Sequence, residues 1–447
     1  MKRKKYYLCI KGWIVAYEKS DDMKVLFINT YESRGGAAIA CRRLVKAVSK
    51  AGTDVHLLVR VPYCGVDRNV SSVSFSRFTR VLNFVRFAWE RFVICFYNRF
   101  SRRNLFSVSI ANTGTDISKL KEVQEADVIH LHWVNQGFLS VTDIKKLTDL
   151  GKPVVWTMHD MWPFTGICHY AGQCCGFEKK CGSCPFLVNP HERDLSAKVF
   201  TRKEQWNFTN ISFIACSRWL RDCARRSTLL QHSYISDIPN PIDTNFWKPQ
   251  NKKQARKLFG FPEDRKLLLF VADNVSDIRK GIVYLYEALE VLASKNADLI
   301  EKTSLVILGK RSKDISLKSP FHTIPIGYLS DAKQICRLYS AVDLFVTPSL
   351  EDNLPNTIME AMACGCPAVG FRIGGIPEMI DHNKNGYIAE SRSAIDLAQG
   401  IEQILFSENY FYYSTQARLK VEQSYAEQYI SRQYIDLYQK LLNSKYE

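Results

Sequence analysis

Short apolar runs that alternate with helical patterns along the whole chain constrain its fold more than any other feature. Each run is a nearly continuous series of β-branched and aliphatic residues, and helical or turn-forming sequence follows it. Strands that are buried on both faces have this composition, and they occur in parallel sheets covered by crossover helices. We therefore expect an α/β protein with parallel sheets, whose strands include residues 24–29, 54–59, 127–132, 153–158, 211–216, 266–271, 304–308, 342–347 and 367–371.

The length of the chain and its prolines indicate two domains. A chain of 447 residues is too long for one ordinary core. The IPNPID segment at 238–243, followed by a polar stretch, is the best linker. We expect an extension or misassigned start over 1–22, an N-terminal domain over 23–240, a C-terminal domain over 241–425 and a closing helix over 426–447. That helix is amphipathic, with an apolar stripe at Ile430, Tyr434, Leu437 and Leu441.

The formal charge of +16 favours an anionic partner. Nucleotide phosphates, anionic lipid and nucleic acid would each fit, but the basic residues are dispersed and match no nucleic-acid-binding motif. No run of about 18 apolar residues occurs, so we expect no membrane-spanning helix. Lys11, Glu18 and Lys19 interrupt the N-terminal apolar stretch, which makes it a poor signal peptide. Fourteen cysteines without such a signal indicate free thiols in the reducing cytoplasm.

The stretch EDNLPNTIMEAMACGCPAVGF at 351–371 predicts a helix with an anion site at its start. Pro355 suits the first turn of a helix, because its fixed φ fits there and its missing N–H is not needed. Gly365 stands where a left-handed residue ends a helix. The helix should therefore cover about 355–364. Its unpaired backbone N–H groups and positive dipole end form a ready site for an anion such as a diphosphate.

Two acids flank this helix start. Asp352 and Glu360 lie eight positions apart, one just outside the helix and the other little more than a turn inside it. Both can therefore approach one ligand, with a carboxylate accepting hydrogen bonds from sugar hydroxyls. A solvated Glu360 on the helix surface would give the same spacing, so the spacing alone leaves both interpretations open.

The wider context of these acids resembles a known family. The sequence TPSLEDNLPNTIMEAMACGCPAVGFRIGGIPEMI strongly resembles the donor-site motif of retaining GT-B glycosyltransferases of family 4. The similarity runs from about Met23 to Tyr438 and includes RGGAA, WTMHDMWPFTG, ACSRWL, IPNPID and RKG. It implies two Rossmann-like parallel-sheet domains facing across a cleft, with the C-terminal helix packing back on the N-terminal domain. The resembling branch builds bacterial capsule, exopolysaccharide or O-antigen chains.

The resemblance also implies roles in a nucleotide-sugar donor site. Glu360 should bind the ribose hydroxyls, and Asp352 should contact the transferred sugar as a catalytic residue, although the family more commonly has Glu there. Arg279 and Lys280 look like the basic pair that neutralises the pyrophosphate, but the family's arginine usually lies nearer Asp273. The full expected donor-binding set is Gly35, Gly36, Arg279, Lys280, Asn353, Leu354, Pro355, Asn356 and Glu360.

The N-terminal half carries further expected site residues. Gly35 and Gly36 follow the first strand and open a helix, which permits close backbone approach to a ligand. The resemblance implies that His159, at a strand's C-terminal end, touches the transferred sugar as the second catalytic residue. We expect His130 to be core, and the acceptor-cleft residues to be His132, Trp133 and Trp162.

The implied reaction is hexosyl transfer from a UDP- or GDP-sugar to a growing lipid-linked polysaccharide, with retention at the anomeric carbon. The departing diphosphate would act as the base, so no protein nucleophile is required. No Asp-x-Asp motif stands in a suitable place, so we expect no catalytic metal. A nucleotide-sugar 2-epimerase on the same fold is the alternative enzyme, and a nucleic-acid-binding protein ranks last.

Two other segments stand apart from the donor motif. Cys168, Cys174, Cys181 and Cys184 lie in a glycine-rich loop and have the makings of a structural four-thiolate zinc site; free, packed thiols are the alternative. Residues 77–103 mix seven arginines with many aromatics. This segment is either a core helix with solvated charges or a contact with an anionic membrane, which for this branch would be the cytoplasmic face of the inner membrane.

Overall fold

The computed structural model describes residues 5–10, 13–18, 23–63, 68–315 and 319–444. The chain divides into two compact units, each built on one parallel sheet. The first unit comprises residues 1–215, 223–238 and 430–447, and the second comprises 216–222 and 239–429. The α/β architecture expected from the alternating pattern is therefore confirmed.

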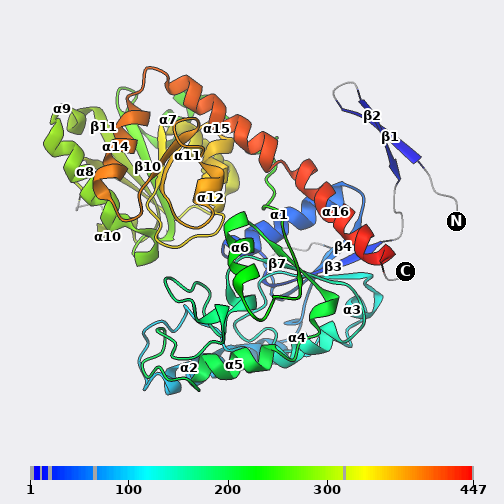
Figure 1. The fold of residues 1–447 in the computed structure, drawn as a ribbon. Helices are drawn as coiled ribbons and strands as arrows, with labels where there is room; N and C mark the ends of the chain where they lie inside the picture. Colours follow the sequence, from blue (N-terminus) through cyan, green and yellow to red (C-terminus); the bar gives the residue numbers. More distant parts are fainter. Residues whose placement is uncertain (1–4, 11–12, 19–22, 64–67, 316–318, 445–447) are drawn as a thin grey trace. The chain divides into compact units, whose positions relative to one another are not determined.

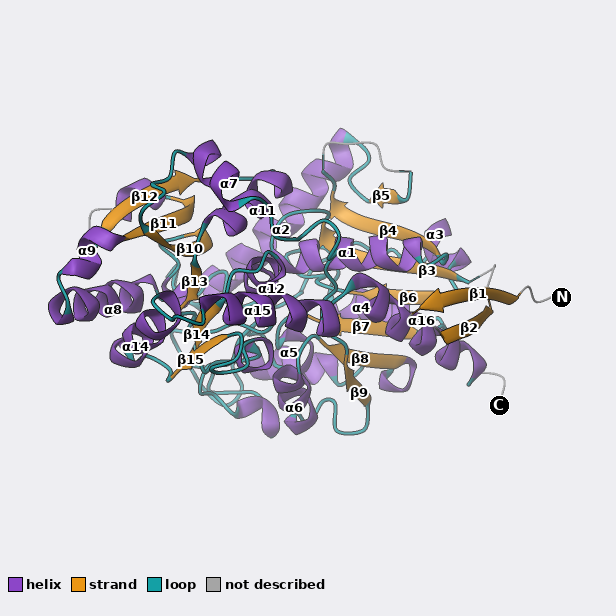
Figure 2. Ribbon diagram, turned by 90° about the horizontal axis from the view of Figure 1, so that it is seen from above, coloured by secondary structure: helices purple, strands orange, loops and turns teal. Residues whose placement is uncertain are grey.

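The first unit contains a seven-stranded sheet in the order β5-β4-β3-β6-β7-β8-β9 (Figure 2), in which every neighbouring pair is parallel. The order reverses between β3 and β6, which creates a crevice at their carboxyl ends where open α/β sheets bind ligands. The strands are β3 Lys24–Tyr31, β4 Asp54–Val61, β5 Val70–Ser72, β6 Val128–Leu131, β7 Val154–Met158, β8 Ile211–Ala215 and β9 Tyr234–Asp237. The helices are α1 Gly36–Lys50, α2 Arg77–Tyr97, α3 Lys121–Glu125, α4 Val141–Thr148, α5 Leu195–Lys203 and α6 Arg218–Arg226, whose first residues count with the second unit.

The second unit contains a six-stranded sheet in the order β12-β11-β10-β13-β14-β15, again parallel throughout (Figure 2). Its order reverses between β10 and β13. The strands are β10 Lys266–Asn274, β11 Thr303–Lys310, β12 His322–Gly327, β13 Leu344–Thr347, β14 Ala368–Phe371 and β15 Gly386–Ala389. The helices are α7 Lys252–Phe259, α8 Ile282–Lys295, α9 Asp298–Lys302, α10 Ser312–Ile315, α11 Ala332–Ala341, α12 Asn356–Ala363, α13 Ile376–Met379, α14 Ala394–Leu405 and α15 Tyr410–Ser424.

Both faces of the second sheet are buried, which explains its continuous apolar strands. In β10, Leu267 and Leu269 enter one core cluster, whereas Leu268 and Phe270 enter the cluster on the other face. Because successive side chains of a strand point to opposite faces, a strand covered on both sides needs an apolar residue at every position. The KLLLFV run thus follows directly from the layer architecture.

The last helix, α16 Glu427–Asn443, belongs mainly to the first unit (Figure 1). Ile430 and Leu437 lie in the same buried cluster as Val25 and Val128 from that unit's sheet. Leu441 packs against the cluster with partial burial. The chain therefore completes the second unit and then returns to the first, as the resemblance implied.

Residues of the expected N-terminal extension form two short strands. β1 Lys5–Ile10 and β2 Trp13–Glu18 pair with each other in antiparallel register as a sheet of their own. The remainder of that segment lies outside the described residues. Across the described parts of the chain, no helix combines the length and apolar character needed to cross a bilayer.

Candidate functional site

Three loops of the second unit meet at the carboxyl ends of β10, β13 and β14. The backbone N–H of Leu350 donates to the carbonyl oxygen of Arg279 at 2.7 Å, which joins the first two loops. A Cβ at Gly281, where φ is +67°, would lie 1.9 Å from the carbonyl oxygen of Pro348. A Cβ at Gly374, where φ is +54°, would lie 1.8 Å from the carbonyl oxygen of Asp352. Only glycine fits at both positions, because a side chain would push the loops apart.

The predicted basic and acidic residues meet inside this assembly. Lys280 Nζ lies 2.6 Å from Asp352 Oδ2, and both side chains are partly shielded from solvent. Arg279 Nη2 instead lies 2.8 Å from Asp277 Oδ2, and its side chain is about half exposed. The structure thus brings Lys280 and Asp352 together, and it pairs Arg279 with a carboxylate outside the predicted set.

Helix α12 supplies the other half of the site. It begins at Asn356, directly after Pro355, and ends at Ala363, with Gly365 in a left-handed conformation at φ +75°. The predicted helix is thus confirmed to within a residue at each end. Glu360 points inward and is only 8% exposed. Tyr339 donates its hydroxyl to Glu360 Oε2 at 3.4 Å.

Tyr339 is a neutral hydrogen-bond donor to Glu360. Burial, together with the negative charge of Glu360, raises the pKa of Tyr339 well above its ordinary value. Its hydroxyl therefore holds one carboxylate oxygen in place. Tyr339 lies in α11 and Glu360 in α12, so no local sequence signal connected them.

Two further contacts in the second unit tie the ACSRWL and GGIPE motifs to the site. Ser217 Oγ donates to Asn353 Oδ1 and also accepts from the Leu220 N–H at 3.1 Å. The carboxylate of Glu378 accepts from the backbone N–H groups of Arg218 at 2.9 Å and Trp219 at 2.8 Å. The sequence assigned no role to Ser217 or Glu378, although a serine just before a helical run is a recognisable N-cap.

In the first unit, Gly35 adopts φ +88° between β3 and α1, and its missing side chain would meet no atom within 4 Å. Glycine is therefore required there by the backbone conformation and not by crowding. Gly36 begins the helix. The approach to this turn is open on the side where a Cβ would stand.

Three histidines lie close together at β6 and β7: His130 and His132 are buried, and His159 is partly buried. His132 Nδ1 lies 2.9 Å from His159 Nε2, so one ring donates and the other accepts. Burial, with the charges of neighbouring histidines, lowers the pKa values of His130 and His132 well below the ordinary value. Burial also lowers the pKa of His159 to about 4. All three imidazoles are therefore neutral at neutral pH, and His159 is suited to hydrogen bonding instead of proton donation from an imidazolium.

Asp160 organises the loop after β7. Its Oδ2 accepts from the Trp133 indole at 2.9 Å and lies 2.7 Å from His169 Nδ1, and its Oδ1 accepts from the Trp162 N–H at 2.9 Å. Burial raises the pKa of Asp160, but the charge of His169 and these hydrogen bonds outweigh burial and leave that pKa below its ordinary value. Asp160 is thus an ionised anchor for Trp133, which is half-buried.

The structure corrects the prediction for Trp162. Its side chain is only 1% exposed, its indole donates to the Ser109 carbonyl at 2.8 Å, and Lys203 Nζ lies 3.5 Å from the ring centroid. A ring so enclosed is a core residue that supports the loop and does not contact an acceptor. His132, at 3% exposed, is likewise nearly covered. The sequence around Trp162, close to His159, does not indicate whether the tryptophan side chain is buried or exposed.

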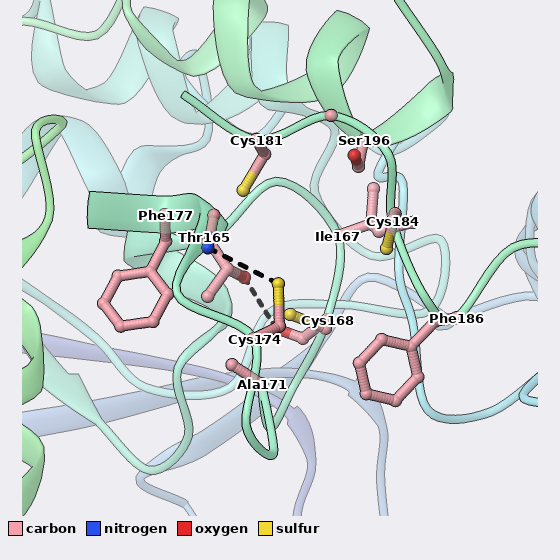
Figure 3. Close-up of a pocket in the computed structure, with 12 residues that line it drawn as sticks. Thr165, Ile167, Cys168, Ala171, Cys174, Phe177, Cys181, Cys184, Phe186 and Ser196 are labelled. Carbon is pink, nitrogen blue, oxygen red and sulfur yellow. Dashed lines mark hydrogen bonds between the residues drawn. The ribbon is translucent and has the colours of Figure 1, made fainter. Parts of the chain in front are cut away.

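The four cysteines predicted to bind zinc line a single cavity (Figure 3). Backbone N–H groups approach two of the sulfurs, from Gly166 to Cys181 at 3.1 Å and from Gly176 to Cys174 at 3.4 Å. Burial raises the pKa of Cys181 to about 11. Across the described ranges, no three His, Cys, Asp or Glu side chains have the spacing of a metal site. The thiols converge without forming a coordination geometry, and zinc binding stays a prediction.

Comparisons with known proteins agree with this architecture. The model described as Glycosyltransferase Family 4 matches residues 34–246, and the model described as Glycosyl transferases group 1 matches residues 251–420. The N-acetyl-α-D-glucosaminyl L-malate synthase of Bacillus anthracis is 27% identical over 211 residues, which are 46% of this chain and 54% of that protein. An uncharacterised glycosyltransferase of Methanocaldococcus jannaschii is 24% identical over 369 residues, which are 75% of this chain and 90% of that protein.

The same fold occurs in solved structures. Sucrose-phosphate synthase from Thermosynechococcus elongatus superposes with a TM-score of 0.65 at 17% identity, covering 94% of this chain and 100% of that one. Anabaena HepE in complex with UDP superposes with a TM-score of 0.61 at 15% identity, with the same coverage. The chain spans about half the length of several curated relatives that it matches. It belongs to the GT-B glycosyltransferases of the family 4 type, as its motifs predicted.

Proposed function

We propose that this protein transfers a hexosyl group from a UDP- or GDP-sugar to a growing, lipid-linked surface polysaccharide, with retention at the anomeric carbon. The observation that carries the proposal is the assembly of Lys280, Asp352 and Glu360 around the start of α12, at the point where the second sheet's strand order reverses. Such a crevice is where open α/β sheets bind nucleotides. Anabaena HepE, which shares this fold, has been solved in complex with UDP and with UDP-glucose, and this supports a nucleotide-sugar donor.

The chemistry of the second unit fits a nucleoside diphosphate. The backbone N–H groups at the start of α12 and the Lys280 ammonium offer positive charge to the diphosphate. Glu360, fixed by Tyr339, offers a carboxylate oxygen to the ribose hydroxyls. The bond between the sugar's C1 and the diphosphate breaks while the acceptor oxygen bonds to C1 on the same face. The acceptor's proton passes to the departing diphosphate oxygen, so no protein nucleophile is needed. We expect Lys280 and the start of α12 to supply the positive charge that a metal would otherwise provide.

The residues of this chain contribute positioning and charge stabilisation. Lys280 and the α12 N-terminus stabilise the charge that develops on the leaving diphosphate, which is the largest single contribution that such a site can make. In the first unit, the neutral ring of His159, held by His132, is suited to hydrogen bond with a sugar hydroxyl. In the second unit, Asp352 is suited to accept from a hydroxyl of the transferred sugar once it exchanges Lys280 for that hydroxyl.

Donor binding by calorimetry tests this assignment. We expect Glu360→Gln and Lys280→Ala to fold normally but to lose most of their affinity for the nucleotide-sugar that binds the native protein. Lys295→Ala is the matched control, because Lys295 is an exposed lysine paired with Glu402 on the outside of the same unit. Unchanged affinity in both site variants would refute the donor site. Conversion of free UDP-sugar to its 2-epimer without an acceptor would favour the epimerase instead.

A further inference from the structure

Helix α2 buries charged side chains on its inner face and exposes apolar side chains on its outer face, which is the reverse of an ordinary surface helix. Its fully buried Glu90 accepts at Oε1 from the backbone N–H groups of Ile110 and Ala111, each at 2.9 Å. The adjacent Arg91, 6% exposed, donates to the Val108 carbonyl at 3.0 Å. Hydrogen bonds of these two side chains and the fully buried Ile94 hold the inner face of the helix to its own unit. A surface helix normally packs inward through an apolar stripe alone.

The outer face of α2 is apolar over its whole length, and the helix lies along the edge of the first unit (Figure 1). Phe78 is 76% exposed, Trp89 53% and Phe96 57%. The exposed residues recur at three- and four-residue spacing, so they form one continuous stripe. We call this stripe the outer face of α2; it comprises Phe78, Val81, Leu82, Val85, Trp89, Phe92 and Phe96. Contiguous exposed apolar surface of this size marks a contact with another phase or partner.

The charges around the outer face select the partner. Exposed arginines stand at the two ends of the helix and just beyond it, at Arg77, Arg80, Arg99, Arg102 and Arg103. The single acid within α2, Glu90, is buried, and its Oε2 lies 3.1 Å from Arg91 Nη2. A second copy of this chain would set arginine against arginine, which is unfavourable. An anionic bilayer accommodates both the apolar stripe and the arginines, because aromatic rings enter the headgroup region while arginines reach the phosphates.

We propose that the outer face of α2 docks on the surface of an anionic lipid bilayer, with the helix lying in the plane of the membrane. The helix of 21 residues presents a stripe about 30 Å long, from the rise per residue. It does not span the bilayer, because Glu90 and Arg91 bind its inner face to the protein. The inference concerns the first unit alone and does not depend on the donor chemistry of the second.

Flotation with lipid vesicles tests the proposal on the full chain. We expect the native protein to float with vesicles of phosphatidylcholine and phosphatidylglycerol, and to float poorly with phosphatidylcholine alone. Combining Phe78→Ser, Trp89→Ser and Phe96→Ser should reduce the bound fraction about tenfold or more, because affinity scales with the buried apolar area. These side chains are exposed, so folding should be unaffected, and an unchanged melting temperature of the full chain would verify it.

A matched control and a charge variant complete the design. Phe411→Ser with Ile395→Ser removes apolar residues of the second unit that are 82% and 72% exposed, and should leave flotation unchanged. Arg77→Glu with Arg99→Glu and Arg102→Glu should abolish the preference for anionic vesicles. Equal flotation of the native protein and the aromatic variant would overturn the proposal. So would failure of the native protein to float, or a concentration-dependent dimer that the aromatic variant loses.

Discussion

The return of α16 to the first unit depends on a chain of buried hydroxyl and imidazole groups, and Tyr438→Phe tests it. The Tyr438 hydroxyl lies 2.7 Å from His130 Nδ1, and Thr157 Oγ1 lies 2.7 Å from His130 Nε2. Thr157 Oγ1 in turn lies 2.8 Å from the Tyr434 hydroxyl. His130 and Tyr438 are fully buried. Burial raises the pKa of Tyr438 and lowers that of His130, so both groups are neutral hydrogen-bonding partners.

Removing the Tyr438 hydroxyl leaves one nitrogen of a buried imidazole without a partner. Such an unsatisfied group costs about 1–3 kcal/mol, and each kcal/mol lowers the melting temperature of a unit of this size by about 2–4 °C. We expect this loss in thermal denaturation of the full chain followed by circular dichroism. Tyr429→Phe is the control, since Tyr429 lies on the same helix and is 55% exposed. Equal melting temperatures for the two variants would refute the idea that this network fastens α16.

Two other predictions concern protons and metals. Because burial lowers the pKa of His159 to about 4, the unfolded chain takes up a proton on this residue first as the pH falls below about 6.5. The free energy of unfolding should therefore fall by up to about 3 kcal/mol between pH 6.5 and 4 through this residue. His159→Gln should make the free energy of unfolding less dependent on pH over this range. The same pH dependence in the native protein and the variant would contradict the prediction. Transfer should persist in EDTA, whereas elemental analysis should find zinc that Cys181→Ser loses and exposed Cys175→Ser retains. Activity that EDTA abolishes and Mn²⁺ restores would contradict the prediction of metal-independent transfer. A native protein without zinc would contradict the predicted zinc site.

The sequence was sufficient for the inner strands of both sheets and for α12, because both follow from local rules. It did not predict the edge strands β5, β9, β12 and β15, which are short or only partly buried. A strand covered on both faces requires apolar residues at successive positions, as Leu267–Phe270 shows. Helix α12 starts after Pro355 and stops before Gly365, so residues within its own local sequence mark both of its ends. Contacts between distant segments were beyond such rules. The bond from Tyr339 to Glu360 and the burial of Trp162 depend on how helices and loops pack, which no periodicity encodes.

Helix α2 shows why a pattern alone can leave an orientation open. Its sequence has one apolar and one polar face, and the usual rule turns the apolar face inward. In the structure the face that carries Glu90 and Arg91 is turned inward, where the two side chains bond to backbone groups within residues 108–111. Burying these side chains without partners would be costly, so the hydrogen bonds offered by this loop favour the observed orientation.

The electrostatics of the second unit also bear on how the proposed donor would be held. Lys280 Nζ and Asp352 Oδ2 lie 2.6 Å apart in an ion pair, and their side chains are 30% and 14% exposed, respectively. A pair with this much exposure is worth about 1 kcal/mol or less. A diphosphate carries more negative charge than one carboxylate, and the α12 N-terminus adds to its attraction. In the proposed complex the exchange of Asp352 for diphosphate at Lys280 would therefore be favourable, and it would free the Asp352 carboxylate to accept a hydroxyl of the attached sugar. Recognition of the diphosphate and of the sugar would then be coupled through one ion pair.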